Sequence, residues 1–228
     1  MTFNAIKQLI YGLYLTNSFG LKLRRTDGSE EKKRLRLGYS QAQLETLNIK
    51  VKIENPEDLP KEGQYIIIIN HRSIIDPPLV EVALKETSLF GPWISKKELY
   101  NSFFFGLFVR HAGSILLDRD KSQMSGFFGE IKEATKRGES IFIFPEGTRN
   151  KSDKPLSAFK EGTRIIALKN RLPILPIYIK DNANDALKNA LADKNLQQEV
   201  RLVIGSPIDY KDKTPLEENY RKIFNLEN

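Results

Sequence analysis

Two short polar segments follow wholly apolar runs of this sequence, and they hold the residue types that could do chemistry. The first carries His71 and, five positions later, Asp76. The second is Glu146–Arg149, a turn-like segment that ends in an arginine. Short apolar runs are typical of buried parallel strands, and sites in open α/β sheets form where such strands end. A base and an anion-binding segment at one sheet edge would suit transfer chemistry on a substrate that carries phosphate.

The pair of His71 and Asp76 allows a catalytic and a structural interpretation. A carboxylate that accepts a hydrogen bond from Nδ1–H fixes the imidazole tautomer and stabilises the imidazolium that forms when Nε2 takes a proton. Asp76 is also a good helix N-cap, because Pro77 and an apolar helical stretch follow it. The two roles can coexist, so His71 is a candidate general base with a structural role as the alternative. The second histidine, His111, is expected to be structural or on the surface.

The segment Glu146–Arg149 predicts an anion site. Arg149 would bind a phosphate with its planar fork of donors, and Thr148 would add donors together with backbone N–H groups. The alternative is an ordinary turn after a buried strand, in which Gly147 supplies a positive φ.

Three further residues are weaker candidates for substrate contacts. Arg119 comes at the end of Gly113–Arg119, after a third apolar run, and it either reaches the same sheet edge or pairs with an acidic neighbour on the surface. Lys96 and Lys97 could bind phosphate or stabilise an oxyanion, although most lysine pairs of this kind are simply solvated.

The composition limits the class of protein. The chain has 228 residues, of which 40% are hydrophobic, so it suits one α/β domain with additions and a sizeable core. It has no Cys, which excludes disulfides, thiolate catalysis and Cys-based zinc sites, and no metal site is expected. A net charge of +7 indicates an acidic partner: nucleic acid, an anionic membrane or a phosphorylated small molecule. Neither a membrane-spanning run nor a signal peptide is expected.

The first 46 residues have the pattern of a membrane-surface helical hairpin. Between residues 20 and 36 there are seven Lys or Arg against three Asp or Glu, a local excess of +4. A helix expected over residues 3–19 precedes this basic cluster, and a second is expected from residue 31 to about 47. The alternative is two helices packed on the core with a solvated basic turn. The first helix favours the membrane interpretation, because its apolar residues form one wide stripe: Phe3, Ile6, Leu9, Ile10, Leu13 and Tyr14.

Strands alternate with helices over residues 47–228. This order predicts an α/β fold with a mostly parallel sheet of about seven strands covered by helices. We therefore expect two parts, the hairpin at 1–46 and a catalytic domain at 47–228. The expected strands are 47–53, 65–69, 90–95, 114–117, 140–144, 174–179 and 200–204, and the expected helices are 77–86, 97–109, 122–136, 157–169 and 185–192.

Four motifs occur in a fixed order. They are Asn-His71-x4-Asp76, Gly113-x5-Arg119, Phe144-Pro-Glu146-Gly147-Thr148-Arg149 and the proline-rich strand at 172–178. Together they resemble the motifs of the glycerolipid acyltransferase family, and in particular its bacterial 1-acyl-sn-glycerol-3-phosphate acyltransferase members. The resemblance covers roughly residues 50–205, and the hairpin is similar to the membrane-dipping element of the bacterial prototype.

The resemblance implies a mechanism. His71 would be the general base on an acceptor hydroxyl, Asp76 would orient it, and the hydroxyl would attack an acyl thioester with no acyl-enzyme. Arg119 and Glu146–Arg149 would hold the acceptor's phosphate. No cofactor is expected beyond the thioester co-substrate, acyl-CoA or acyl carrier protein.

The expected function is therefore acylation of lysophosphatidic acid to phosphatidic acid in phospholipid biosynthesis. The enzyme would be peripheral or monotopic on the cytoplasmic face of an anionic membrane. One alternative is acylation of another lysolipid or of an ornithine-type lipid. Two non-enzymatic alternatives are a basic nucleic-acid-binding module and an inactive lipid-binding scaffold. The intact His71–Asp76 pair speaks against the scaffold, and no aromatic-basic recognition motif supports a nucleic-acid partner.

Overall fold

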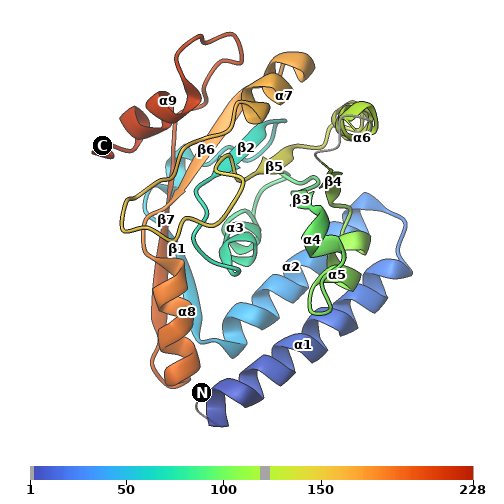
Figure 1. Cartoon of the computed structure of the whole chain (residues 1–228), viewed down its shortest axis with the longest axis vertical. Coiled ribbons are helices and arrows are strands. Elements are labelled where there is room, and N and C mark those ends of the chain that lie inside the picture. Colours follow the sequence, from blue (N-terminus) through green and yellow to red (C-terminus); the bar gives the residue numbers. More distant parts are fainter. Residues whose placement is uncertain (1–2, 119–123, 228) are drawn as a thin grey trace.

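The computed structural model of the chain describes residues 3–118 and 124–227, and it has the expected α/β fold (Figure 1). A mostly parallel sheet has the strand order β1-β7-β6-β2-β5, in which only β6 and β7 pair antiparallel. The described strands are β1 (Ile49–Ile53), β2 (Ile66–Ile69), β3 (Ile94–Lys96), β4 (Ile115–Leu117), β5 (Ile141–Ile143), β6 (Ile174–Ile179) and β7 (Gln198–Ile204).

The seven expected strands are present among the described residues, but they divide into two sheets. Five form the central sheet, and β3 pairs only with β4 in a small parallel sheet. A parallel bridge between Trp93 and Phe142 connects the two sheets. The strand expected at 90–95 starts only at Ile94, because Pro92 has no N–H to give to a ladder.

The hydrophobic core lies on both faces of the central sheet. The four isoleucines of β2 are fully buried, and their side chains alternate between the two faces. One face is covered by α3 (Asp76–Ala83) and α8 (Ala183–Ala192). The other is covered by α6 (Met124–Lys136), α7 (Gly162–Asn170) and α9 (Leu216–Ile223). Burial on both sides explains why this strand reads as a continuous apolar run rather than an alternating one.

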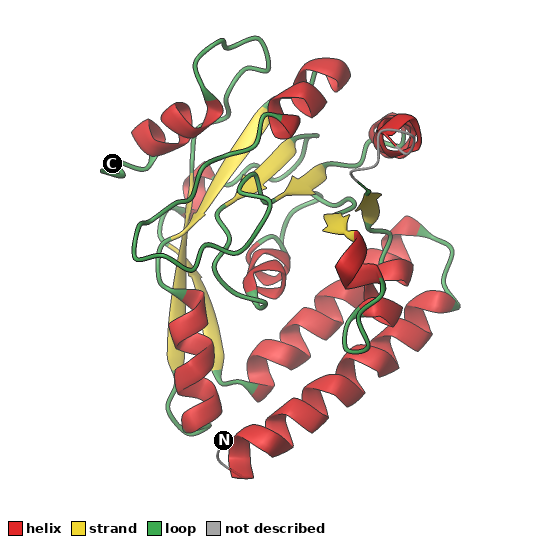
Figure 2. Cartoon of the chain, in the orientation of Figure 1, coloured by secondary structure: helices red, strands yellow, loops and turns green. Residues whose placement is uncertain are grey.

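The N-terminal hairpin is confirmed. Figure 2 shows α1 (Phe3–Arg24) and α2 (Ser29–Thr46) as two long helices beside one another along one side of the molecule. Thr16 on α1 and Tyr39 on α2 share a buried hydrogen bond of 3.1 Å. The expected domain boundary at residues 46–47 falls between α2 and β1, and α2 packs closely against α3 across it.

Two expected helices differ from the structure, and two observed helices were not expected. The helix expected at 97–109 is two short helices, α4 (Lys97–Tyr100) and α5 (Gly106–His111). The hydroxyl of Ser102 accepts the N–H groups of Phe104 and Phe105 between them, which competes with helical hydrogen bonds. The helix expected at 157–169 starts only at Gly162. The sequence pattern missed α9 and a short 3₁₀ helix, η1 (Pro56–Asp58).

Candidate active site

His71 follows β2, and its imidazole is hydrogen-bonded to a buried carboxylate. Its Nδ1 lies 2.8 Å from Oδ2 of Asp76, the first residue of α3. The same oxygen accepts the backbone N–H groups of Arg72 at 2.7 Å and Ser73 at 2.8 Å. These three donors compensate for the complete burial of the Asp76 side chain. An ionised carboxylate only accepts, so Nδ1 carries the proton and Nε2 is left as the proton-accepting nitrogen.

The expectation that Asp76 caps α3 is wrong. The cap position is Ile75, and no side chain caps this end of the helix. The carboxylate turns back to the loop before the helix, because the N–H groups of Arg72 and Ser73 point at it there. Its second oxygen, Oδ1, is buried without a hydrogen-bond partner among the described residues.

An aromatic ring fixes the plane of the imidazole. Phe144, just after β5, stacks on His71 with 3.9 Å between ring centroids and 12° between the ring planes. Strands β2 and β5 are parallel neighbours, so the two polar segments start from the same sheet edge, as the sequence predicted.

Glu146 is buried and joins the two polar segments. Its Oε1 accepts the backbone N–H of His71 at 2.7 Å. Its Oε2 accepts the backbone N–H of Ser157 at 2.8 Å and also the hydroxyl of Ser157. The sequence grouped Glu146 with the phosphate contacts, but the structure directs its carboxylate inward. We therefore assign it a positioning role in place of a substrate contact.

The rest of this segment faces solvent. Gly147 has a φ of +67°, a left-handed conformation that favours glycine, and its N–H donates to the carbonyl of Phe144 at 2.9 Å. Thr148 and Arg149 are exposed next to it. Arg149 makes no hydrogen bond or ion pair with any residue that the structure describes. Its guanidinium is therefore available to an anionic ligand.

The two lysine candidates lie at the carboxyl end of the small sheet. Lys96 ends β3, and the ammonium of Lys97 lies 2.7 Å from the carboxylate of Asp118 just after β4. The carboxyl ends of β3 and β4 point the same way as the carboxyl end of β5, which leads to Glu146, because the bridge between the two sheets is parallel. Arg119 lies outside the described residues.

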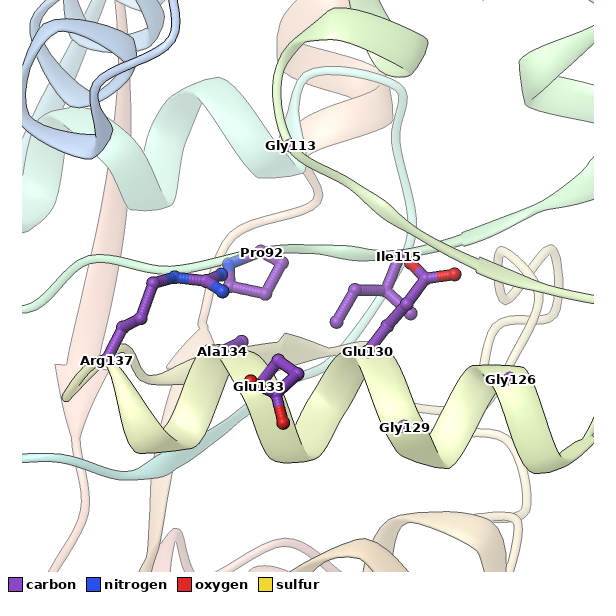
Figure 3. A pocket seen from close by; sticks show the side chains of 9 residues that line it. All are labelled: Pro92, Gly113, Ile115, Gly126, Gly129, Glu130, Glu133, Ala134 and Arg137. Atoms are coloured by element: carbon purple, nitrogen blue, oxygen red, sulfur yellow. The ribbon is translucent and has the colours of Figure 1, made fainter.

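Gly113 lies at the opposite, amino end of β4, with a φ of +81°. It lines a pocket of about 400 Å³ between α6 and the chain around Pro92 (Figure 3). The parallel arrangement of β3, β4 and β5 places this pocket away from the edge that carries His71. Gly113 therefore shapes a turn before β4 and is not brought together with the His71 site.

Sequence reasoning missed two residues that hold the site together. The amide of Asn70 donates to the carbonyl of Ile179 at 3.0 Å and accepts its N–H at 2.8 Å, which ties the end of β2 to the end of β6. The guanidinium of Arg72 donates to the carbonyls of Ser152 and Lys154 and so anchors the loop after β5. Their signal in the sequence was only that polar residues flank His71.

Residues 50–180 match the family model described as Acyltransferase, and this match covers more than half of the chain. The chain therefore belongs to the Acyltransferase family.

Its relatives include a protein of Helicobacter pylori named 1-acyl-sn-glycerol-3-phosphate acyltransferase, 36% identical over 51% of this chain and 48% of the relative. A Bacillus subtilis protein of the same name is 29% identical over 71% of this chain and 75% of the relative. The chain thus spans about half the length of the H. pylori relative. The crystal structure of a Thermotoga maritima 1-acyl-sn-glycerophosphate (LPA) acyltransferase has the same fold, with a TM-score of 0.66 at 24% identity over 97% of this chain and 93% of that one.

Proposed function

We propose that this chain is a 1-acyl-sn-glycerol-3-phosphate acyltransferase that makes phosphatidic acid from lysophosphatidic acid and an acyl thioester. The observation that carries the proposal is the 2.8 Å hydrogen bond from His71 to Asp76, which leaves Nε2 as a base. The exposed Arg149 follows the neighbouring strand β5. The names of the relatives support the same substrate class.

In the proposed reaction, Nε2 of His71 takes the proton of the acceptor hydroxyl as the hydroxyl oxygen attacks the thioester carbonyl carbon. The new C–O bond gives a tetrahedral oxyanion, and its collapse breaks the C–S bond. The leaving thiolate takes the proton back from the imidazolium. Asp76 stabilises the imidazolium in between, and no acyl-enzyme forms.

The acceptor's phosphate would lie against Arg149, with the Thr148 hydroxyl as a further donor. Lys96, at the carboxyl end of β3, is our candidate for stabilising the oxyanion. A zwitterionic or ornithine-type acceptor would gain less from the Arg149 guanidinium, which favours lysophosphatidic acid among the possible acceptors. Acyl-CoA and acyl carrier protein both remain candidate donors, and no other cofactor is part of the proposal.

An exposed apolar surface supports a peripheral or monotopic enzyme. Within the part of the chain that the structure describes, no helix is long and apolar enough to cross a membrane. The outer face of α1 nevertheless exposes Ile6, Ile10 and Tyr14, and Phe103, between α4 and α5, is 87% exposed. Helix α5, which begins three residues after Phe103, packs against α1, so Phe103 and the exposed side chains of α1 lie on neighbouring parts of the fold. We propose that they enter an anionic bilayer, on its cytoplasmic face, beside the basic cluster of residues 20–36.

A panel assay tests the proposed function. Purified protein is given lysophosphatidic acid, other lysolipids and an ornithine lipid, each with labelled acyl-CoA or acyl carrier protein, and products are identified by mass. The expected result is labelled phosphatidic acid with wild type and none with His71→Ala. Preferential acylation of a zwitterionic lysolipid would overturn the proposed acceptor, and acylation that is unchanged in folded His71→Ala would overturn the mechanism.

A further inference from the structure

A buried arginine connects the hairpin to α3 and to the segment before β3. Arg36 lies on α2 with only 4% of its side chain exposed. Its Nε donates to Oε1 of Glu81 on α3 at 3.1 Å, and Nη2 donates to the same oxygen. Its Nη1 donates to the carbonyl of Gly91 at 2.7 Å, and its guanidinium lies over the ring of Phe90, 4.7 Å from the centroid. These contacts hold the guanidinium in one orientation.

The same carboxylate orients a tryptophan. Oε1 of Glu81 also accepts Nε1–H of Trp93 at 2.9 Å, so three N–H groups converge on one oxygen. Trp93 is almost fully buried, and its indole can turn only if this hydrogen bond breaks. The segment before it approaches the chain before β5 closely, since a Cβ on Gly91 would lie 1.7 Å from the carbonyl oxygen of Ser140.

From Trp93, stacked rings lead to the general base. The indole stacks on Phe142 with 4.9 Å between centroids and on Phe144 with 5.0 Å. Phe144 in turn stacks on His71 at 3.9 Å. A second route runs along α3, because Glu81 and Asp76 lie on the same helix and Asp76 holds Nδ1 of His71. Arg36 is therefore linked to Phe144 and to Asp76, the two side chains that fix the imidazole.

Stability alone does not account for a buried ion pair at this place. Removing two charges from water costs free energy that their attraction often only offsets, and apolar residues of similar size are frequently as stable. The pair of Arg36 and Glu81 instead supplies a defined orientation. The planar guanidinium fixes the Arg36 side chain, and three donors on one carboxylate oxygen fix the Glu81 side chain. An apolar pair would fill the space but leave Nε1–H of Trp93 without an acceptor.

We infer that Arg36 and Glu81 are positioning residues for the general base, acting on His71 through the Trp93–Phe144 stack. This inference rests on the proposed function, because it assigns the imidazole its catalytic task. The helix that the hairpin places against the core thereby contributes to the geometry of the dyad. Neither residue belongs to the four sequence motifs.

The chain offers a direct reading of the imidazole by NMR. It has two histidines, so the spectrum contains two ring systems, which His71→Ala assigns. Stacking on Phe144 shifts the ring protons of His71 upfield, and the bond to Asp76 shifts its Nδ1–H downfield. The variants are the double substitution Arg36→Met with Glu81→Leu, the single substitution Trp93→Phe, and the conservative Glu81→Gln, which keeps a carbonyl acceptor for Trp93.

We expect the double variant and Trp93→Phe to change the His71 ring shifts and to lower kcat by about tenfold to 10²-fold, the range for a slightly misplaced catalytic group. KM for both substrates should stay within about twofold of wild type. Glu81→Gln should restore most of the kcat and the His71 shifts, and the signals of His111 should not move. The matched control is Arg34→Met with Glu31→Leu, which removes an exposed ion pair from the same helix and should leave the His71 shifts unchanged.

The outcomes separate this inference from the proposed function. Wild-type His71 shifts and kcat in a folded Trp93→Phe protein would overturn the positioning role, even if His71→Ala is inactive. Altered His71 shifts in the variants, together with full activity of His71→Ala, would support the positioning geometry and overturn the function. A loss of activity with unchanged His71 shifts would reduce Arg36 to a merely structural role.

Discussion

The carboxylate of Glu146 accepts the backbone N–H of His71 at 2.7 Å, although the two residues are 75 positions apart in the chain. The carbonyl of His71 accepts the N–H of Asn150 at 2.6 Å, from the same loop. The main chain of His71 is thus held on both sides by the segment after β5, while Asp76 and Phe144 hold the side chain. The site is therefore held together as one unit, and substituting Glu146 tests this conclusion.

Glu146→Gln should destabilise the protein and lower kcat. An amide offers one acceptor oxygen where the carboxylate offers two, so either the His71 or the Ser157 N–H loses its partner, which costs about 1–3 kcal/mol. Thermal unfolding and steady-state kinetics measure both effects. Ser157→Ala is the control, because it removes the hydroxyl but keeps the N–H bond, and it should have the smaller effect. If Glu146→Gln instead has a wild-type Tm and raises only the acceptor KM, the carboxylate acts on the substrate.

His71→Ala should lower kcat by about 10²–10⁴-fold, the range for a lost general base, and should leave the fold intact. Asp76→Asn should lower kcat by a comparable or smaller factor, because the charge that stabilises the imidazolium is lost. The measurements are turnover with lysophosphatidate and circular dichroism of the purified variants. Near-normal turnover of folded His71→Ala would end the mechanism. The wild-type rate should also fall on acidification, since a protonated imidazole accepts no proton.

Arg149→Ala should chiefly raise the KM for the phosphate-bearing acceptor. Losing one charge-assisted partner of a phosphate costs about 1.5–3 kcal/mol, or roughly tenfold to 10²-fold in binding. Acceptor and thioester are varied separately in the assay. Lys151→Ala, an exposed cation two positions further on the same loop, is the matched control and should have little effect. A change confined to the thioester KM would move Arg149 to the donor side.

Replacing Ile6, Ile10 and Tyr14 by Ser should release the protein from anionic vesicles. The three side chains are exposed on one face of α1, so the fold should persist, whereas each buried apolar residue contributes up to about 1.5–3 kcal/mol to insertion. The measurement is sedimentation with vesicles in low and high salt. Ile165→Ser with Leu168→Ser, exposed apolar residues on α7, is the control and should still sediment.

Full sedimentation of the triple variant would place the contact elsewhere, and Phe103→Ser is then the next variant to test. This design keeps the hairpin in the protein. Deleting residues 1–46 would also remove Arg36 and leave the carboxylate of Glu81, which is only 12% exposed, without its cation.

Much of the fold could be predicted from the sequence, because local patterns encode it. The isoleucine run of β2 and the apolar residues of β5 require burial on both faces, and helices between strands imply parallel pairing. The break after Tyr100 and the late start of α7 could not be predicted. Both depend on single polar contacts, the Ser102 hydroxyl with the next N–H groups and the Ser157 N–H with Glu146.

By itself, the sequence determined that His71, Asp76 and Arg149 stand at or near strand ends, because short apolar runs end immediately before them. Tertiary structure decided which way each side chain points and which residues it contacts. It turned Glu146 inward to the backbone of His71, placed Gly113 at the opposite sheet edge, and brought Arg36 of the hairpin against Glu81. The physical reason is that apolar burial is set by local periodicity, whereas a polar contact between distant segments depends on strand order and loop path, which no local pattern contains.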